Sequence, residues 1–188
     1  MTIYVSSLAD MPYLVPQLGV RDLVSIIQPN AQPPTPAGVD PARHHRCPVH
    51  DIVEAQPGEV LPETRHIVEL VEFLRTWDGK AALLIHCHAG VSRSTAAALI
   101  AHVLHSGDPR RSATALREAS PYAWPNRRIV ALADSILGLD GELIAAREGM
   151  GPAVWETDPD DEEIAAAARH LHGYKPGRYT RLTVSADR

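Results

Sequence analysis

The strongest chemical signal in the sequence is the run IHCHAGVSRSTAAA, residues 85–98. Cys87 ends an apolar run of strand length, Gly90 marks a tight loop, and Arg93 stands where a helix begins. A strand, a glycine loop and a helix N-terminus in this order direct successive backbone N–H groups at one point, which makes an anion site. The same dipoles favour the ionised form of a thiol, so Cys87 is expected to be a thiolate and a nucleophile.

Arg93 supplies the second half of this site. From the helix start its side chain can fold back over the loop and offer a planar fork of donors to two oxygens of a tetrahedral dianion. The net charge of −5 argues against a nucleic-acid platform, so a bound anion must be held locally. The alternative for Cys87 is a buried, inert core thiol. We expect an anion site with no metal, no cofactor and no nucleic-acid partner.

The run HCHAGVSRS resembles the H-C-x5-R-S/T signature of the cysteine-dependent phosphatases, and GVSRS is closest to their dual-specificity branch. The resemblance implies hydrolysis of phosphomonoesters through a cysteinyl-phosphate intermediate, with Cys87 as nucleophile and Arg93 as phosphate clamp. It also implies the loop residues whose backbone N–H groups bind the phosphate: His88, Ala89, Gly90, Val91, Ser92 and Arg93.

The same resemblance gives roles to two neighbours of the loop. His86 would hydrogen-bond the loop and help to keep the thiolate in place, and Ser94 would donate its hydroxyl to the sulfur as it leaves. A satisfied core histidine and a serine in the first turn of a helix are the alternatives for these residues.

Phosphoryl transfer also needs a proton donor for the leaving oxygen and a base for the attacking water, and one carboxyl group can serve as both. The resemblance places an Asp on a loop a few tens of residues before the nucleophile. Our choice for this carboxyl group is Asp51, which lies 36 residues ahead of Cys87 at the end of CPVHDI, a predicted strand end. Its alternative is an N-cap or a solvated loop carboxylate. The remaining candidates for the acid are Glu54, the next choice, and Asp40, Glu59 and Glu63.

A second segment, SPYAWPNRR at residues 120–128, resembles the place where dual-specificity phosphatases begin a helix with Pro-Asn beside the phosphate loop. Asn126 is then a helix cap or a ligand of the site. Tyr122 and Trp124 either form a wall for a substrate ring or are seated against the core.

The loop composition bears on the substrate. Lipid phosphatases of this class carry Lys in the loop for additional phosphates, whereas this loop presents His, Ala, Val and Ser. The favoured substrate is phosphotyrosine of proteins, with or without phosphoserine and phosphothreonine. The alternatives are a small-molecule or lipid phosphate, and a pseudophosphatase that binds phosphoproteins without turnover. Cys47, the other cysteine, is core filler or a redox partner that forms a disulfide with Cys87.

The elements that must position these residues are predicted by their patterns. The continuous apolar run at 81–87 is typical of a central strand covered on both faces, and the Ala-rich run at 92–105 predicts a buried helix that ends at Gly107. A short helix interrupted by Pro separates two further strands, and RCPVHDI forms a third strand or strand end. The remaining strands and helices are predicted at 2–7 and 22–28, and at 62–77, 110–119 and 126–138.

Strands that alternate with helices predict an α/β three-layer sandwich, with a central, mostly parallel sheet of four to five strands flanked by helices. The run from Pro29 to Arg46 has neither periodicity nor apolar content, and a loop of this length in a compact domain is often functional.

With 188 residues, 45% of them apolar, the chain is expected to fold as one domain. We assign residues 1–150 to a phosphatase domain and 151–188 to a C-terminal helical extension, with a helix at about 160–172. The N-terminus does not resemble a secretory signal and no apolar run is long enough to cross a bilayer, so a cytoplasmic address without membrane contact is expected. The preference for Arg over Lys is typical of a GC-rich, bacterial genome.

Overall fold

The computed structural model describes residues 1–154 and 179–184. Five strands form one sheet in the order β3-β2-β4-β1-β5, in which four strands are parallel and β5 is antiparallel to β1. The strands are β1 (Thr2–Ser6), β2 (Val20–Ile26), β3 (His44–Cys47), β4 (Ala82–His86) and β5 (Thr180–Thr183). The mostly parallel, helix-flanked sheet confirms the predicted fold class, and the apolar run at 81–87 is its central strand.

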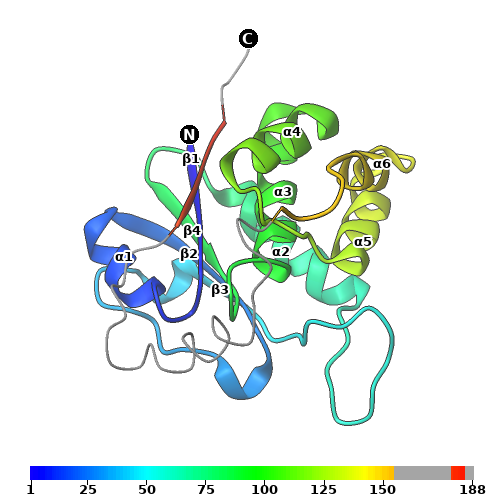
Figure 1. The fold of residues 1–188 in the computed structure, drawn as a ribbon. Helices are drawn as coiled ribbons and strands as arrows, with labels where there is room; N and C mark the ends of the chain where they lie inside the picture. The colour runs from blue at the N-terminus through cyan, green and yellow to red at the C-terminus, as the bar shows by residue number, and fades with distance from the viewer. Residues whose placement is uncertain (155–178, 185–188) are drawn as a thin grey trace.

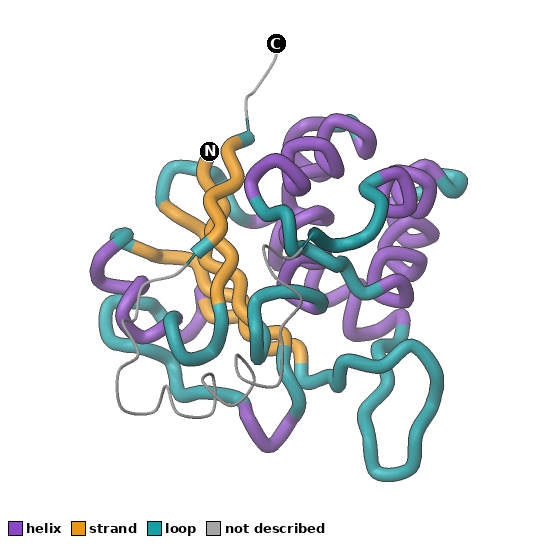
Figure 2. Tube along the Cα trace, in the orientation of Figure 1, coloured by secondary structure: helices purple, strands orange, loops and turns teal. Residues whose placement is uncertain are grey.

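Helices cover the two faces of the sheet unequally (Figure 1). The short helix α1 packs on one face, while α2 to α6 gather on the other, where they appear as one purple group beside the orange sheet in Figure 2. The described helices are α1 (Met11–Gln17), α2 (Thr64–Thr76), α3 (Arg93–Ser106), α4 (Pro109–Ala119), α5 (Arg127–Leu137) and α6 (Glu142–Gly149). Among these residues no helix has both the length and the apolar character that a membrane span requires.

Helix α3 lies at the centre of the larger helical layer and contacts α2, α4, α5 and the sheet. Its small side chains, Ala96, Ala97, Ala98 and Ala101, are fully buried, which is expected for a helix that has neighbours on several sides. Gly107 ends the helix in the left-handed conformation, with φ +70°. The predicted buried helix and its predicted end are therefore both confirmed.

Some boundaries differ from those predicted. Strand β2 begins at Val20 rather than at residue 22, because its first residues pair with β4 next to an irregularity in the register. Strand β3 ends at Cys47, so residues 48–52 form a loop and not a strand end. The run from Pro29 to Arg46 is only partly irregular, since it includes two single-turn helices, η1 (Pro29–Ala31) and η2 (Pro41–Arg43), and the start of β3.

Two elements were not predicted from the sequence. Helix α6 has only eight residues and buries just Leu143 and Ala146, so its apolar period is too short to recognise. Strand β5 has four residues and adds an edge to the sheet beside β1, with Leu182 opposite Ile3. It lies within the span assigned to a helical extension, while the helix expected at about 160–172 lies outside the described residues.

We predict that strand β5 contributes to the stability of the whole domain. Leu182 is 1% exposed and joins the main core, so Leu182→Ala should lower the free energy of unfolding by about 2–4 kcal/mol. Arg181, which is exposed on the other face of the same strand, is the matched control. Arg181→Ala should change the free energy of unfolding by at most about 0.5 kcal/mol. Urea denaturation measures both; equal stability of the two variants would show that β5 is dispensable.

Candidate active site

The predicted nucleophile loop lies at the carboxyl end of the central strand. Strand β4 ends at His86, Cys87 follows it, and α3 begins at Arg93. The carboxyl ends of parallel strands are where open α/β sheets place their ligand sites. A surface cavity of about 390 Å³ opens there, and it is lined by Gln28, Asp51, Cys87, His88, Ala89, Val91, Ser92 and Arg93.

The loop carbonyls are held from behind by other segments. The Leu8 N–H donates to the His88 carbonyl at 3.1 Å, and the Trp124 N–H donates to the Val91 carbonyl at 2.9 Å. The Ser92 carbonyl accepts from the N–H groups of Ala96 and Asn126. No peptide bond among the described residues is cis, and in a trans peptide the C=O and the next N–H point in opposite directions. The N–H groups that follow these carbonyls therefore point away from the donors, and we expect them to face the cavity that the loop lines.

Gly90 allows this loop to turn. Its φ of +81° lies in the region that favours glycine, and a Cβ on it would stand 2.9 Å from the Ser6 carbonyl carbon. The loop therefore packs directly against the end of β1. No other residue type fits this position without moving one of the two backbones.

The Cys87 sulfur lies among donors. The side chain is 2% exposed, its Sγ accepts from the Gly90 N–H at 3.2 Å, and the Ser94 Oγ lies 3.1 Å away. Both groups can donate to a thiolate, and Ser94 is itself fully buried. The geometry thus brings the Ser94 hydroxyl to the sulfur.

Arg93 is buried beneath the cavity, at 5% exposure. Its Nη1 donates to the Gln28 Oε1 at 3.1 Å and to the Val49 carbonyl at 2.9 Å. Its Nε lies 3.7 Å from the Asp51 Oδ2, close enough for an ion pair but too far for a hydrogen bond, and it has no hydrogen-bond partner among the described residues. A buried donor without an acceptor costs about 1–3 kcal/mol, so an anion oxygen in the cavity would relieve this cost.

Asp51 is the acidic side chain that the fold brings to the loop. It lies past the end of β3, lines the cavity, and accepts from the Ser92 hydroxyl at 2.7 Å and the Asn126 amide at 2.8 Å, both through Oδ1. The alternatives lie elsewhere: Glu54 is 85% exposed and pairs with Arg127, and Asp40 caps the short helix η2. Glu63 begins α2 and pairs with Arg65.

Asn126 is a helix cap, one of the two roles that the sequence left open, and it also contacts Asp51. Its Oδ1 accepts from the N–H groups of Arg128 and Ile129 and so caps α5, while its Nδ2 donates to Asp51. Gln28 was not predicted to belong to the site. Its position just past β2, the parallel neighbour of β4, was the available signal, because adjacent parallel strands end at the same edge.

His86 does not touch the sulfur. It is fully buried, its Nδ1 lies 3.3 Å from the Cys87 carbonyl oxygen, and its Nε2 lies 2.6 Å from the Ser25 Oγ. Burial lowers the pKa of His86 to about 4, so its ring is neutral near pH 7. It reaches Cys87 through the main chain.

The structure argues against a disulfide between Cys47 and Cys87. Both thiols are free, and β2 lies between the strands that carry them, with Ile26 opposite Cys47. Two strand spacings place the Cα atoms roughly 10 Å apart, beyond the reach of a disulfide. Burial raises the pKa of Cys47 to about 12, so this thiol is not ionised near neutral pH. Cys47 is core filler.

The two aromatic side chains near the loop differ in their surroundings. The Tyr122 hydroxyl lies 3.2 Å from the Thr180 Oγ1, which ties this ring to β5. Trp124 is 43% exposed, and the Arg147 guanidinium carbon lies 4.6 Å from the centre of its ring. Because the backbone N–H of Trp124 donates to the Val91 carbonyl, this exposed aromatic residue lies next to the loop that follows Cys87.

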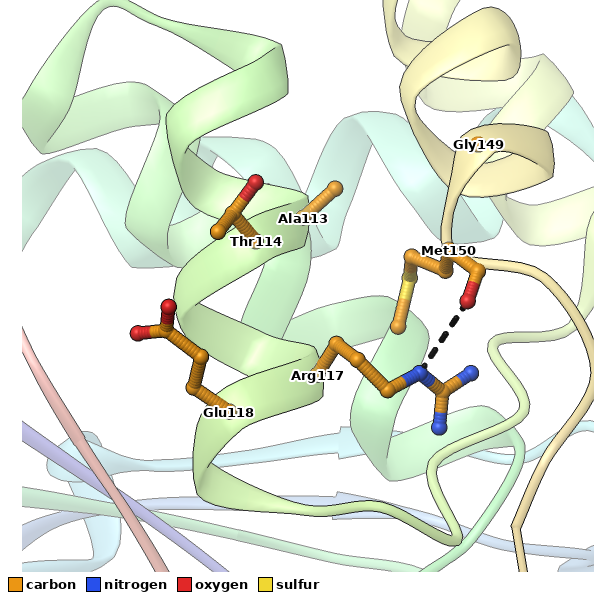
Figure 3. Close-up of a pocket in the computed structure, with 6 residues that line it drawn as sticks. All are labelled: Ala113, Thr114, Arg117, Glu118, Gly149 and Met150. Carbon is orange, nitrogen blue, oxygen red and sulfur yellow. Dashed lines mark hydrogen bonds between the residues drawn. The ribbon is translucent and has the colours of Figure 1, made fainter.

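A second cavity, of about 160 Å³, lies between α4 and the end of α6 (Figure 3). Figure 3 shows Arg117 turned toward Met150, whose carbonyl it binds at 3.2 Å; it also binds the carbonyls of Pro121 and Gly151. This arginine joins chain segments to each other. The lining holds neither cysteine nor histidine, so we place no chemistry there.

Solved structures with the same fold include dual-specificity phosphatases and a tyrosine phosphatase-like protein. Human DUSP28 matches with a TM-score of 0.57 at 22% identity, over 73% of this chain and 90% of that one. The human tyrosine phosphatase-like serine/threonine/tyrosine-interacting protein gives 0.54 at 19% identity, over 73% and 92%. PTPMT1 in complex with PI(5)P gives 0.52 at 16% identity, over 88% and 94%. No protein-family model matches the chain, and neither does any curated protein. The chain therefore has the fold of the dual-specificity phosphatases, as the motif implied.

We predict that Gly90→Ala damages the anion site specifically. The added Cβ would press on the Ser6 backbone at 2.9 Å and displace the loop, so the dissociation constant for inorganic phosphate should rise about tenfold or more. The matched control is Gly138→Ala, because Gly138 has φ +65° with open space around its Cβ position. This control should lose stability, on the order of 1 kcal/mol, and keep its phosphate affinity. Calorimetric titration with inorganic phosphate measures both affinities. An unchanged phosphate affinity in Gly90→Ala would contradict the prediction.

Proposed function

We propose that this protein is a phosphatase that hydrolyses phosphomonoesters through a cysteinyl-phosphate intermediate, and that phosphotyrosine of proteins is its principal substrate. The observation that carries the proposal is the arrangement at one cavity of a buried thiol, a buried arginine with an unpaired Nε and a carboxyl group. The fold of the chain is consistent with this chemistry, since its structural neighbours include phosphatases.

In the first step, the Cys87 thiolate attacks phosphorus and the bond from phosphorus to the ester oxygen breaks. The leaving oxygen takes its proton from the Asp51 carboxyl group. The backbone N–H groups of the loop and the Arg93 guanidinium hold the other phosphate oxygens, where negative charge gathers in the transition state. The unpaired Nε of Arg93 supports its assignment as the clamp, because a phosphate oxygen would complete its hydrogen bonding.

In the second step, the Asp51 carboxylate takes a proton from water and the water oxygen attacks phosphorus. The sulfur-phosphorus bond breaks, the electron pair returns to Cys87 as a thiolate, and inorganic phosphate leaves. Ser94, at 3.1 Å from the sulfur, donates a hydrogen bond to the departing thiolate. His86 supports the loop from behind through the Cys87 carbonyl.

Two features favour an aryl phosphate in a protein. Trp124 is an exposed ring next to the loop, where it can pack against a substrate ring or a peptide. Among the described residues that line the cavity, Arg93 is the one Lys or Arg side chain, so a second phosphate on the substrate would meet little positive charge from them.

A second candidate function is binding of phosphoproteins without turnover. The similarity to the tyrosine phosphatase-like interacting protein motivates it, because the same fold supports an interaction role there. The presence of Cys87, Arg93 and Asp51 at one cavity favours catalysis. A lipid phosphate is the third candidate, motivated by the structure of PTPMT1 with PI(5)P. A survey of phosphotyrosine, phosphothreonine and phosphoinositide substrates with the purified protein separates the three.

We also propose that residues 1–150 form the catalytic domain, because every residue assigned to the site lies within them. In this proposal the segment after residue 150 completes the sheet through β5 and contributes no catalytic side chain.

We predict distinct effects for the two central residues. Cys87→Ser should lower kcat for p-nitrophenyl phosphate by at least about a thousandfold, because the nucleophile is lost, and should retain phosphate binding. Arg93→Lys should lower kcat/KM by about 100-fold to 1,000-fold and weaken phosphate binding as well, because an ammonium group cannot replace the planar fork. Steady-state kinetics and phosphate inhibition measure these effects. Undiminished hydrolysis by Cys87→Ser would rule out the mechanism.

We predict that the effect of Asp51→Asn depends on the leaving group. A phenolate leaving group needs the proton, so kcat for phenyl phosphate should fall by about 100-fold or more. The p-nitrophenolate ion hardly needs it, and its kcat should fall less than about tenfold. The matched control is Glu54→Gln, whose exposed side chain lies away from the cavity and should leave both rates unchanged. Equal losses for the two substrates, or a larger loss in the control, would assign the proton transfer to another group.

A further inference from the structure

A continuous chain of side-chain hydrogen bonds runs from the surface to the main chain of Cys87. The Arg46 Nη2 donates to the Thr35 Oγ1 at 3.0 Å, and Thr35 lies 2.9 Å from the Nδ1 of His44. The His44 Nε2 lies 2.7 Å from the Ser25 Oγ, which lies 2.6 Å from the His86 Nε2. The chain ends at the Cys87 carbonyl, 3.3 Å from the His86 Nδ1. Its outer end is Arg46, an exposed residue of β3, and Thr35 lies in the irregular part of the run from Pro29 to Arg46 that the sequence singled out.

The sheet register explains why these side chains meet. Strand β2 lies between β3 and β4, with Ser25 directly opposite His86 and with Leu23 opposite His44. Ser25 and Leu23 lie two residues apart, so they share one face of the sheet. Ser25 is therefore the bridge between a histidine from each neighbouring strand, and all three side chains are buried.

The chemistry of the end groups fixes the direction of every bond. A carbonyl oxygen can only accept, so the His86 Nδ1 carries a proton, and in a neutral ring the Nε2 must then accept from Ser25. Ser25 has a single hydroxyl hydrogen, so its oxygen accepts from the His44 Nε2–H. The His44 Nδ1 is then an acceptor, and Thr35 donates to it. The guanidinium of Arg46 can only donate, which agrees with this order.

Both rings are neutral under physiological conditions. Burial is the main cause that lowers the pKa of His44 and of His86 to about 4. Each ring thus carries one proton near pH 7, which is the condition that the assignment of directions requires.

We propose that Ser25, His44 and Thr35 are positioning residues, which fix the tautomer of His86 and through it orient the first peptide of the nucleophile loop. A hydrogen bond that holds the Cys87 carbonyl on the back of the loop turns the N–H of His88 in the opposite direction, toward the bound phosphate. Consecutive bonds with one direction also polarise one another, which strengthens this N–H as a donor. The effect on catalysis rests on the proposed phosphatase function, whereas the tautomers do not.

The first test is nitrogen NMR of the histidine rings in the labelled full chain. We expect the Nδ1–H tautomer for His86 and the Nε2–H tautomer for His44. Thr35→Val removes the hydroxyl with almost no change of shape, and it should shift His44 away from the single tautomer, while Thr35→Ser should restore it. A wild-type His86 in the Nε2–H form, or a Thr35→Val spectrum identical to the wild type, would overturn the proposal.

The second test measures the loop itself. Ser25→Ala breaks the chain at its centre and should weaken inorganic phosphate binding and lower kcat/KM for p-nitrophenyl phosphate, each about tenfold. Thr35→Val should change both in the same direction by a smaller factor, and Thr35→Ser should match the wild type. Unchanged phosphate affinity in Ser25→Ala, with melting temperature and NMR dispersion intact, would overturn the proposal. Should the wild type show no turnover, the phosphatase assignment fails, and tautomers and phosphate affinity still decide on the positioning role.

Discussion

The candidate site depends on one constraint, which is that the loop from Cys87 to Arg93 must keep its N–H groups on one side. Each carbonyl of such a loop then points to the other side and needs a donor there. The carbonyls of Cys87, His88, Val91 and Ser92 have such donors, which come from the buried His86, from the segment after β1, from the segment before α5 and from α3 itself. The sheet and the helical layer therefore do more than bury apolar surface, because segments at their edges supply the hydrogen-bond donors that fix the conformation of the loop.

The burial of Arg93 places a second constraint on the same region. A guanidinium at 5% exposure is costly to bury unless its donors are paired. Gln28 and the Val49 carbonyl satisfy one nitrogen, and Asp51 supplies a nearby negative charge. Because Asn126 and Ser92 hold Asp51, the carboxylate is tied to the loop and to the cap of α5 at once. Arg93, Asp51 and the Asn126 cap of α5 thus form one connected set of contacts.

The buried histidines show how polar groups are accommodated in a sheet whose buried side chains are mainly apolar. His86 and His44 lie on strands at either side of Ser25, and each uses both ring nitrogens. A chain with fixed direction satisfies every one of these groups, which is how a buried polar network avoids the cost of desolvation. By contrast, Cys47 lies on the same strand as His44 and behaves as a small apolar residue.

The sequence by itself determined the central strand, the buried helix and the loop between them, because continuous apolar runs and a Cys-x5-Arg spacing are local signals. It also favoured Asp51 over the other carboxylates, and the structure brings Asp51 to the cavity. Only the tertiary structure decided which distant groups meet near the loop: Gln28 binds Arg93, Asn126 binds Asp51, and Ser25 lies between two histidines. Strand β5 and helix α6 likewise needed the assembled sheet and helical layer, since neither has enough residues for a pattern of its own. Strand order and register set these contacts, and both follow from packing between segments far apart in the chain, which no local pattern encodes.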